Sequence, residues 1–140
     1  MPSVDAGKYA VFLVDDHPLI RRGIRKIIEG SPELEVVGEA GDGQEFLDFL
    51  NHRPTPNLAI MDLSMPRMGG IEATYKAKAS HPQIKILILT MHETGEYVEL
   101  ALAAGAEGYL LKEEVGSELL AAIATLRRGG KFISQTLWPR

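Results

Sequence analysis

The stretch YAVFLVDD, residues 9–16, is an apolar run that ends in two carboxylates. Short apolar runs without polar alternation are typical of strands in a parallel sheet that is covered on both faces. Four more runs of this kind follow along the chain. We therefore predict further strands at residues 35–37 (EVV), 58–61 (LAIM), 84–89 (IKILIL) and 109–111 (YLL).

Helical patterns alternate with these runs. Residues 18–29 place isoleucines at helical spacing, begin with a proline suited to a first turn, and are followed by Gly30. Strands that alternate with helices indicate an α/β protein with right-handed crossovers, and five parallel strands match the doubly wound, flavodoxin-like order 2-1-3-4-5. The other helices are predicted at residues 44–51, 71–79, 96–104 and 117–129, the last with Ser117 as its cap.

The composition is that of one folded domain. The chain has 140 residues, of which 45% are hydrophobic and 24% charged, which excludes a disordered tail, a collagen-like repeat and a large multidomain enzyme. The absence of cysteine excludes a disulfide framework, a thiol nucleophile and a cysteine-ligated metal. A net charge of −4 offers no general attraction to nucleic acid or to an anionic membrane.

The sequence also carries expectations about location and boundaries. No apolar run approaches the roughly 18 residues of a membrane span, and the N-terminus lacks the features of a signal peptide. We therefore expect a cytoplasmic protein with no membrane partner. We expect residues 1–8 to be an N-terminal extension, residues 9–130 to be the domain, and residues 131–140, which show no periodicity, to be a linker or tail.

Polar side chains follow four of the five predicted strands. Asp15 and Asp16 end the first strand, Asp62 the third, Thr90 the fourth and Lys112 the fifth. In the predicted order these strand ends meet at one edge, beside the first strand, where doubly wound sheets bind ligands. Three clustered carboxylates repel one another unless a cation lies among them, and carboxylate oxygens suit Mg²⁺. The sequence thus predicts a magnesium site.

The remaining side chains at this edge suit a phosphoryl group. Lys112 offers a point charge and Thr90 a hydroxyl, and Asp62 can act as a carboxylate nucleophile that forms an aspartyl phosphate. Each residue alone has an ordinary alternative as a helix cap, a turn residue or a surface lysine. The hypothesis depends on their joint occurrence at the ends of the correct strands.

Four motifs resemble the receiver domain of bacterial two-component response regulators: VDDHPLIRRGI, MDLSMPRMGGIEA, ILILTMHE and GAEGYLLKE. The resemblance covers about residues 9–130 and is greatest to the NarL/FixJ subfamily, because of DDHP, GYLLK and a closing RRGGKFIS. It implies a CheY-like fold, phosphorylation by a histidine kinase, and a homodimer that phosphorylation favours. It further implies control of transcription through a C-terminal helix-turn-helix domain that we expect to be absent from this chain, so that DNA is bound only through that domain.

The resemblance assigns roles at the predicted site. Asp62 matches the phosphoacceptor. Asp15 and Asp16 match the acidic pair that holds Mg²⁺, with Asp62 itself and the backbone carbonyl of Ser64 as the other protein ligands. Pro66 and Gly70 match the family's loop after the acceptor.

A second set of roles concerns switching. Thr90 matches the switch hydroxyl, Lys112 the lysine that pairs with the phosphoryl group, and Tyr109 the aromatic switch residue, which we expect to turn inward into the space that Thr90 leaves. The fourth helix, fifth strand and fifth helix then form the output surface. Lys112 precedes Glu113 where the family often has proline, so we expect a trans peptide bond there.

Two other classes of protein fit the architecture. A phosphohydrolase with an aspartate nucleophile would carry a second carboxylate two residues after it, where this chain has Ser64. A flavodoxin-like cofactor binder would carry a phosphate-cradling loop after the first strand, where two carboxylates would repel phosphate. We therefore expect a phosphoacceptor signalling domain that is not an enzyme, although it assists its own phosphorylation and dephosphorylation.

Several further side chains have competing interpretations. Met91, directly after Thr90, is predicted to form a partial lid over the acceptor, and the alternative is that it packs into the core. The basic side chains of the first helix favour a solvated face over a docking surface for a kinase or a second copy; they are Arg21, Arg22, Arg25 and Lys26. The histidines show no metal-ligand spacing and are interpreted as non-catalytic; they are His17, His52, His81 and His92.

Overall fold

A six-stranded parallel sheet in the order β2-β1-β3-β4-β5-β6 forms the centre of the computed structural model, which describes residues 7–91 and 97–137. The predicted α/β class and the order 2-1-3-4-5 are confirmed. The strands are β1 (Tyr9–Val14), β2 (Leu34–Ala40), β3 (Leu58–Asp62), β4 (Lys85–Thr90), β5 (Gly108–Leu111) and β6 (Phe132–Ile133). The helices are α1 (Pro18–Glu29), α2 (Gly43–His52), α3 (Gly70–Ser80), α4 (Val98–Ala104) and α5 (Val115–Arg127), with 3-10 turns η2 (Lys112–Glu114) and η3 (Gln135–Leu137).

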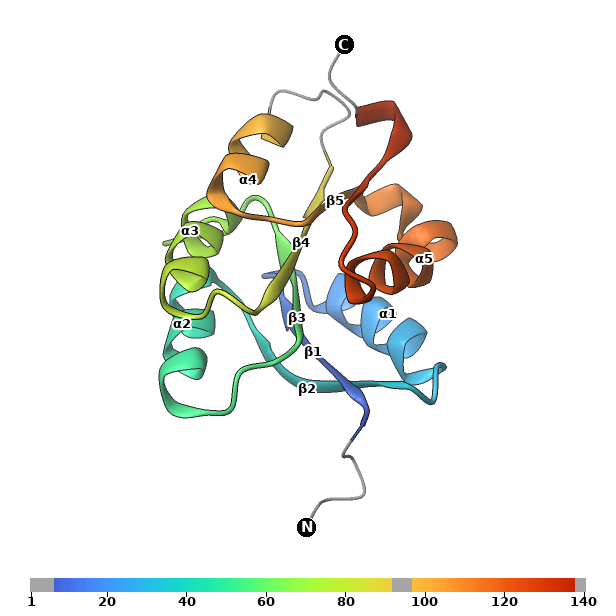
Figure 1. Cartoon of the computed structure of the whole chain (residues 1–140), viewed down its shortest axis with the longest axis horizontal. Helices are drawn as coiled ribbons and strands as arrows, with labels where there is room; N and C mark the ends of the chain where they lie inside the picture. Colours follow the sequence, from blue (N-terminus) through green and yellow to red (C-terminus); the bar gives the residue numbers. More distant parts are fainter. Residues whose placement is uncertain (1–6, 92–96, 138–140) are drawn as a thin grey trace.

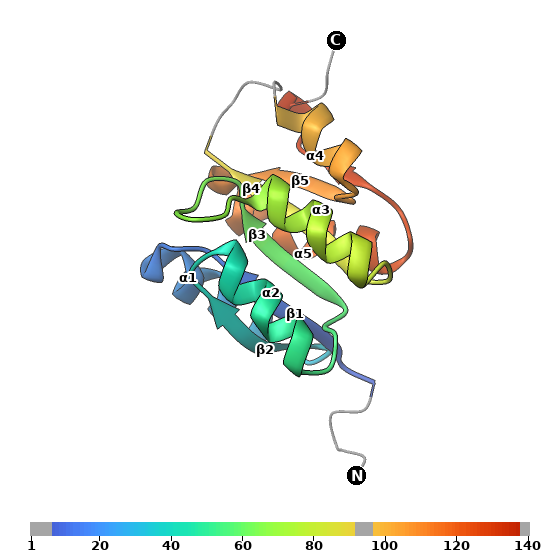
Figure 2. The ribbon, with the colours of Figure 1, turned by 90° about the vertical axis from the view of Figure 1, so that its left-hand side faces the viewer.

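Helices cover both faces of the sheet. Figure 1 shows α2, α3 and α4 on one face and α1 and α5 on the other, and Figure 2 shows the α2–α4 layer from its own side. Side chains of a strand alternate between faces, and both faces of β1 are apolar. Phe12 and Val14 therefore join the core under α2–α4, whereas Val11 and Leu13 join the core under α1 and α5. This explains why the strands are continuous apolar runs.

The second strand is longer than the predicted 35–37. It runs from Leu34 to Ala40 and pairs with β1 along its whole length. Gly38 suggests a strand end in the sequence, but here it lies opposite Phe12, whose ring would be 2.6 Å from a Cβ atom at this position. The glycine thus makes room for a core aromatic ring within the strand.

The last helix also begins differently. The chain enters it through the 3-10 turn η2, and α5 starts at Val115, so Ser117 lies in the first turn and is not the cap. No cis peptide bond occurs in the described ranges, which confirms the trans bond between Lys112 and Glu113. The expectations placed on residues 1–6, His92, Glu96 and Trp138 lie outside the described residues.

The prediction that residues 131–140 are a linker or tail is wrong for residues 132–137. Phe132 and Ile133 pair with β5 as the edge strand β6, and the Leu111 backbone N–H donates to Ser134 Oγ at 3.0 Å. Ile133 and Leu137 are buried in the core under α2–α4. Two paired residues are too short a strand to produce a periodic pattern, and they become a strand only because β5 offers them a free edge.

No helix within residues 7–91 and 97–137 is long and apolar enough to cross a bilayer.

We predict that Leu137→Ala lowers the free energy of unfolding by about 2–5 kcal/mol, because it removes a fully buried side chain. Urea unfolding monitored by circular dichroism measures the change. Leu120→Ala is the matched control, since Leu120 is 47% exposed, and its effect should be much smaller. Equal, small effects of the two substitutions would show that residues 132–137 are not part of the folded domain.

Candidate functional site

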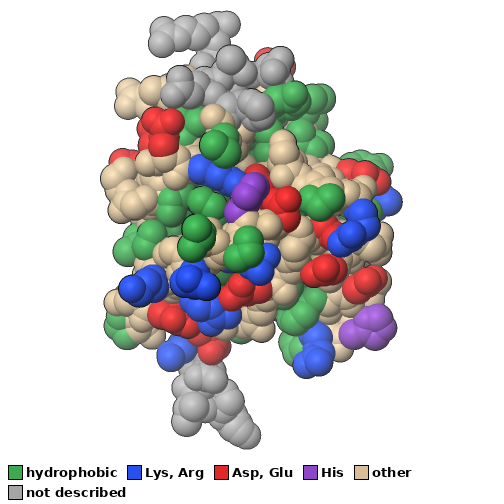
Figure 3. All heavy atoms as spheres, turned by 180° about the vertical axis from the view of Figure 1, so that it is seen from behind, with side chains coloured by type: hydrophobic (Ala, Val, Ile, Leu, Met, Phe, Trp, Pro, Cys, Tyr) green, Lys and Arg blue, Asp and Glu red, His purple; other side chains and the backbone are tan. Residues whose placement is uncertain are grey.

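The predicted carboxylates lie together at the carboxyl ends of β1 and β3. The side chains of Asp15 and Asp62 are 3% and 5% exposed, and that of Asp16 is 34% exposed. Strands β1 and β3 are neighbours in the sheet, so residues that are 47 positions apart in the chain are brought to the same edge. Figure 3 shows this face: near its middle, a histidine lies between acidic and basic side chains, with hydrophobic side chains around them.

Lys112 lies between the two buried carboxylates. Its ammonium Nζ is 3.2 Å from Asp15 Oδ2 and 3.2 Å from Asp62 Oδ1, and its side chain is 8% exposed. A buried ammonium between two carboxylates offsets part of their repulsion, but the cluster keeps an excess of negative charge because Asp16 is a third carboxylate. The site therefore still favours an added cation.

The pKa of Asp62 is raised above its ordinary value. Burial is the largest cause and the nearby charge of Asp15 adds to it, whereas Lys112 and the backbone N–H of Ser64 act in the opposite direction. Asp62 Oδ1 faces Lys112, but Asp62 Oδ2 receives no hydrogen bond from any described residue. A buried carboxylate oxygen without a donor is costly, so Oδ2 is available to a metal ion or to a reaction partner.

The structure places His17 beside the carboxylates, although the histidines show no metal-ligand spacing in the sequence. Its Nδ1 lies 2.8 Å from Asp15 Oδ1, 3.1 Å from Asp16 Oδ1 and 3.7 Å from Asp62 Oδ2. Donor atoms of these four side chains lie within 4.8 Å of one another. In the sequence, the position of His17 next to the Asp15-Asp16 pair could have indicated its place near these carboxylates. Its approach to Asp62 depends on the pairing of β1 with β3 and is not visible in the sequence. His52 is placed elsewhere, on α2.

The arrangement fits a hard divalent cation. Three carboxylates of which two are buried, together with the unpartnered Asp62 Oδ2, offer the oxygen ligands that Mg²⁺ takes. Ser64 lines the same pocket as Asp62, on the loop that follows β3. The predicted metal ligands are thus brought together.

Of the two predicted switch residues, Thr90 lies in the same pocket as Asp62 and Lys112, and Tyr109 lies in the core. Thr90 is 1% exposed and lines the pocket that contains Asp62 and Lys112. Tyr109 is fully buried in the core under α2–α4. The expectation that its ring turns inward when Asp62 is phosphorylated stays a prediction.

Met91 lies at the rim of the pocket. Its side chain contributes to the lining beside Thr90 and Lys112, yet the residue is 73% exposed. The alternative that Met91 packs into the core is therefore wrong. An exposed, flexible thioether at the pocket mouth is a partial cover that solvent and small molecules can pass.

The loop after Asp62 is anchored at its far end and in its middle. Gly70 brings the loop back to β3, where a Cβ atom would be 2.4 Å from the backbone oxygen of Asp62, so only glycine fits. In the middle of the loop, Arg67 has a φ of 63° and its guanidinium pairs with Asp42, the fully buried cap of α2. The backbone N–H of Glu45, and then Arg67, hold the pKa of Asp42 below its ordinary value. The loop thus positions Ser64.

The basic face of α1 is partly engaged within the molecule. Arg21 and Arg25 pair with Glu39 of β2, with Nε–Oε distances of 2.9 Å and 2.7 Å. Arg21 also donates to the backbone carbonyl of Asp15. These contacts favour neither a purely solvated face nor a free docking surface, because Arg21 helps to fix the turn that carries the carboxylate pair.

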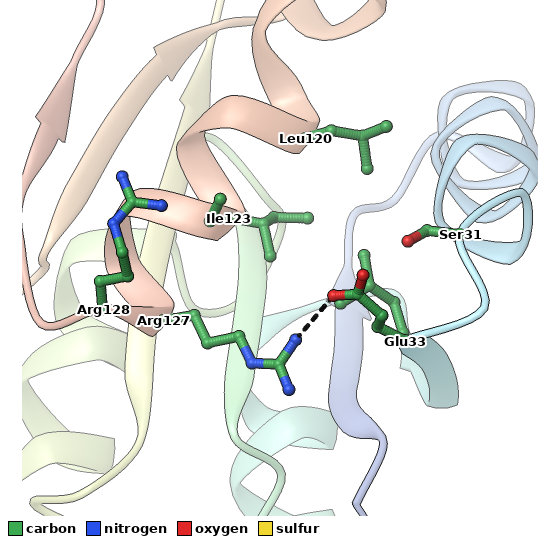
Figure 4. Close-up of a pocket in the computed structure, with 8 residues that line it drawn as sticks. Ser31, Glu33, Leu120, Ile123, Arg127 and Arg128 are labelled. Carbon is green, nitrogen blue, oxygen red and sulfur yellow. Dashed lines mark hydrogen bonds and ion pairs between the residues drawn. The ribbon is translucent and has the colours of Figure 1, made fainter.

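A second hollow lies between α5 and the turn after α1. Figure 4 shows Leu120 and Ile123 facing it, with Arg127 and Glu33 paired across its opening at 3.2 Å. It is a mainly apolar surface groove that contains no cluster of carboxylates. The chemistry therefore belongs to the pocket around Asp62.

Comparison with known proteins identifies the family. The profile of the response regulator receiver domain matches residues 11–124. The chain therefore belongs to the response regulator receiver domain family, and it is a receiver domain of the two-component type. The CheY-like fold and the NarL/FixJ-type resemblance that the sequence implied are confirmed.

Three relatives show the extent of the similarity. The transcriptional regulatory protein YxjL of Bacillus subtilis is 43% identical over 138 residues, which cover 92% of this chain and 63% of YxjL. A LuxR-family response regulator from Aurantimonas superposes with a TM-score of 0.86 at 37% identity, covering 93% of this chain and 92% of that structure. RcsB from Salmonella enterica, bound to a promoter in the presence of the phosphomimetic BeF3−, gives a TM-score of 0.84 at 32% identity over 93% of this chain and 64% of RcsB. Another structure contains two RcsB dimers bound to DNA. The chain spans less than two thirds of the length of YxjL and of this RcsB.

The raised pKa of Asp62 predicts a pH-dependent stability. The folded protein keeps the Asp62 proton over a pH range in which the unfolded chain has lost it. This contribution to stability is present below the ordinary aspartate pKa and is lost as the pH rises through the raised value. Without divalent cations, Asp62→Asn should therefore melt about 2–4 °C above the wild type near neutral pH. The difference should shrink as the pH is lowered to about 4.

Calorimetric melts in EDTA at several pH values measure this difference. Asp48→Asn is the control, because Asp48 is an exposed carboxylate of α2 away from the cluster. A wild type that is as stable as Asp62→Asn at neutral pH would contradict the conclusion that the Asp62 charge is unfavourable in the folded protein.

Proposed function

We propose that this domain is a phosphorylation switch in the cytoplasm, in which Asp62 accepts a phosphoryl group from a histidine kinase with Mg²⁺ as cofactor. The observation that carries the proposal is the pocket around Asp62 Oδ2, an unpartnered oxygen that Lys112, Thr90 and a carboxylate pair surround. Few other reactions need a nucleophilic carboxylate, a buried ammonium and a cation site at one point.

Different residues of the chain have different roles in the phosphoryl transfer. An oxygen of Asp62 forms a bond to phosphorus while the phosphorus–nitrogen bond of the phosphohistidine breaks, and the electron pair of that bond returns to the imidazole. Mg²⁺, when held by Asp15, Asp16, Asp62 and the Ser64 carbonyl, supplies neutralisation of charge on the phosphoryl oxygens. Lys112 holds Asp62 Oδ1 in place at 3.2 Å, while Oδ2 receives no hydrogen bond from the described residues.

The switch follows from the charge of the product. An aspartyl phosphate adds negative charge at the sheet edge, which attracts the Lys112 ammonium and the Thr90 hydroxyl. Tyr109 is buried in the core under α2–α4, and phosphorylation is proposed to favour its inward ring position and the attached α4–β5–α5 surface. The size of this population shift is limited by the difference in the free energy with which the phosphoryl group interacts with the two conformations.

A phosphohydrolase has less support. Ser64 stands where a second acid or base would be needed, and its backbone N–H donates weakly to Asp62 Oδ1, at 3.4 Å. We therefore propose a phosphoacceptor that is not an enzyme for external substrates and that assists its own phosphorylation and dephosphorylation.

Incubation with acetyl phosphate and Mg²⁺ tests the acceptor. We expect whole-protein mass spectrometry to show the gain of one phosphoryl group in the wild type and none in Asp62→Asn, because the amide is not a nucleophile of comparable strength. Asp48→Asn, the exposed carboxylate variant, should gain the group as the wild type does. An unchanged wild-type mass would contradict the proposal, as would a gain that survives in Asp62→Asn.

The position of Met91 predicts an effect on rates. Met91→Ala should speed both phosphorylation by small donors and spontaneous dephosphorylation, by about two- to tenfold, which is up to ~1.4 kcal/mol in the barrier. The reason is that both reactions need an attacking group to approach phosphorus in line through the pocket mouth. Mg²⁺ affinity should stay nearly unchanged.

Stopped-flow and phosphate-release measurements give the two rates. Tyr75→Ala on α3 removes a side chain that is 66% exposed and provides the control for loss of an exposed apolar group. If Met91→Ala leaves both rates at the control value, the side chain is not a lid.

The proposal also concerns dimerisation and the control of transcription. We propose that phosphorylation favours a homodimer, and that transcription is controlled through a C-terminal helix-turn-helix domain outside this chain; the RcsB relatives include dimers bound to DNA. This chain alone is net acidic and should show no sequence-selective binding in a gel shift.

Sedimentation with and without BeF3− and Mg²⁺ tests the dimer. We expect a larger weight-average mass with the phosphate mimic, because the added charge shifts the population of the output surface. Identical profiles at high protein concentration would count against it.

A further inference from the structure

His17 is placed among the cation-binding carboxylates in a way that the proposed function does not use. Its Nδ1 is 2.8 Å from Asp15 Oδ1, 3.1 Å from Asp16 Oδ1 and 3.7 Å from Asp62 Oδ2. A metal–ligand distance of about 2.1 Å puts neighbouring ligands of an octahedral ion about 3 Å apart. The distances of 2.8 Å to Asp15 and 3.1 Å to Asp16 are close to this spacing, and the distance of 3.7 Å to Asp62 is longer.

A second, independent feature points to an ion at the same place. The Asp62 side chain is 5% exposed, and its Oδ2 has no hydrogen-bond donor among the described residues. The Nδ1 atom of His17 lies 3.7 Å from Asp62 Oδ2, which is beyond hydrogen-bond distance. His17 and Asp62 line the same pocket. A group that fits between them and binds both is a cation.

We propose that His17 is a nitrogen ligand of this site, so that the site binds borderline divalent transition ions, such as Co²⁺, Ni²⁺ or Zn²⁺, more tightly than Mg²⁺. The inference rests on the proposed function in that it concerns the same cation site. Imidazole favours these ions, whereas Mg²⁺ is served by oxygen ligands alone. His17 thus determines which metals the receiver accepts.

The local structure allows this role. His17 precedes the first turn of α1, its side chain makes no capping hydrogen bond, and it is 53% exposed, so the ring can reorient. The backbone N–H of His17 already donates to Asp15 Oδ1 at 2.8 Å. Asp15 therefore keeps one donor when the ring turns its nitrogen toward a metal. The chain has no cysteine, so no thiolate competes for the ion.

A competing role for the ring is hydrogen bonding alone. In that case Nδ1–H donates to Asp15 and Asp16 and would leave when a cation arrives, so loss of His17 would change the affinity for every cation alike. His17→Gln separates the two roles, because the amide keeps an N–H donor but lacks the imidazole nitrogen.

The test measures binding of Co²⁺ and of Mg²⁺ separately, by calorimetry on the wild type, His17→Ala, His17→Gln and His52→Ala. We expect Co²⁺ to bind the wild type more tightly than Mg²⁺, and both His17 variants to lose about tenfold or more in Co²⁺ affinity. Their Mg²⁺ affinity should change by less than about threefold. His52→Ala, which removes an exposed histidine of α2, should match the wild type.

The visible spectrum of bound Co²⁺ and the hyperfine-shifted imidazole N–H signal in the proton NMR spectrum report the ligand directly. We expect a histidine signal in the wild type that is absent in both His17 variants, and this readout on the wild type stands even if a variant folds poorly. Equal changes for the two metals, rescue by His17→Gln, or a Co²⁺ complex without a histidine signal would each overturn the inference. No phosphoryl donor is present, so these outcomes are independent of phosphorylation of Asp62 in Mg²⁺.

Discussion

Repulsion among the carboxylates at one edge of the sheet is the constraint on which the rest of the site depends. Asp15 and Asp62 are buried close together, and Lys112 is the ammonium that lies between them. Burial makes their charges costly and raises the pKa of Asp62, so the folded protein holds an unfavourable charge in its resting form. A bound cation or a proton relieves this cost. The repulsion within the cluster is therefore the physical basis of the metal binding and of the response to phosphorylation that we propose.

The surrounding structure keeps this cluster from rearranging. Arg21 donates to the carbonyl of Asp15 and pairs with Glu39, which fixes the turn after β1. The loop after β3 is fixed by Gly70 and by the pair of Arg67 with the buried Asp42. Carboxylates that could separate would lower their repulsion by moving apart. Both supporting turns are anchored, so the carboxylates cannot relieve their repulsion by moving apart. The repulsion therefore favours binding of a cation or a proton at the site.

Much of the fold and most of the site could be predicted from the sequence. Continuous apolar runs such as Tyr9–Val14 indicate buried parallel strands because both faces of the sheet are covered, and the residue that ends each run falls at the carboxyl edge. The prediction failed where a contact and not a pattern decides the structure. Phe132–Ile133 became a strand only by pairing with the free edge of β5, and Gly38 lies within β2 because its missing side chain admits Phe12.

The sequence by itself determined the class of fold and the charges that meet at the sheet edge, and it predicted Asp62 as the acceptor, because these depend on periodicity and on the residue at the end of each strand. The tertiary structure decided how His17, Met91 and Tyr109 lie around that acceptor. His17 approaches Asp62 across neighbouring strands, Met91 stays exposed at the pocket mouth, and Tyr109 is buried in the core. Distances between side chains on different strands follow from strand pairing and rotamers, which no local pattern encodes.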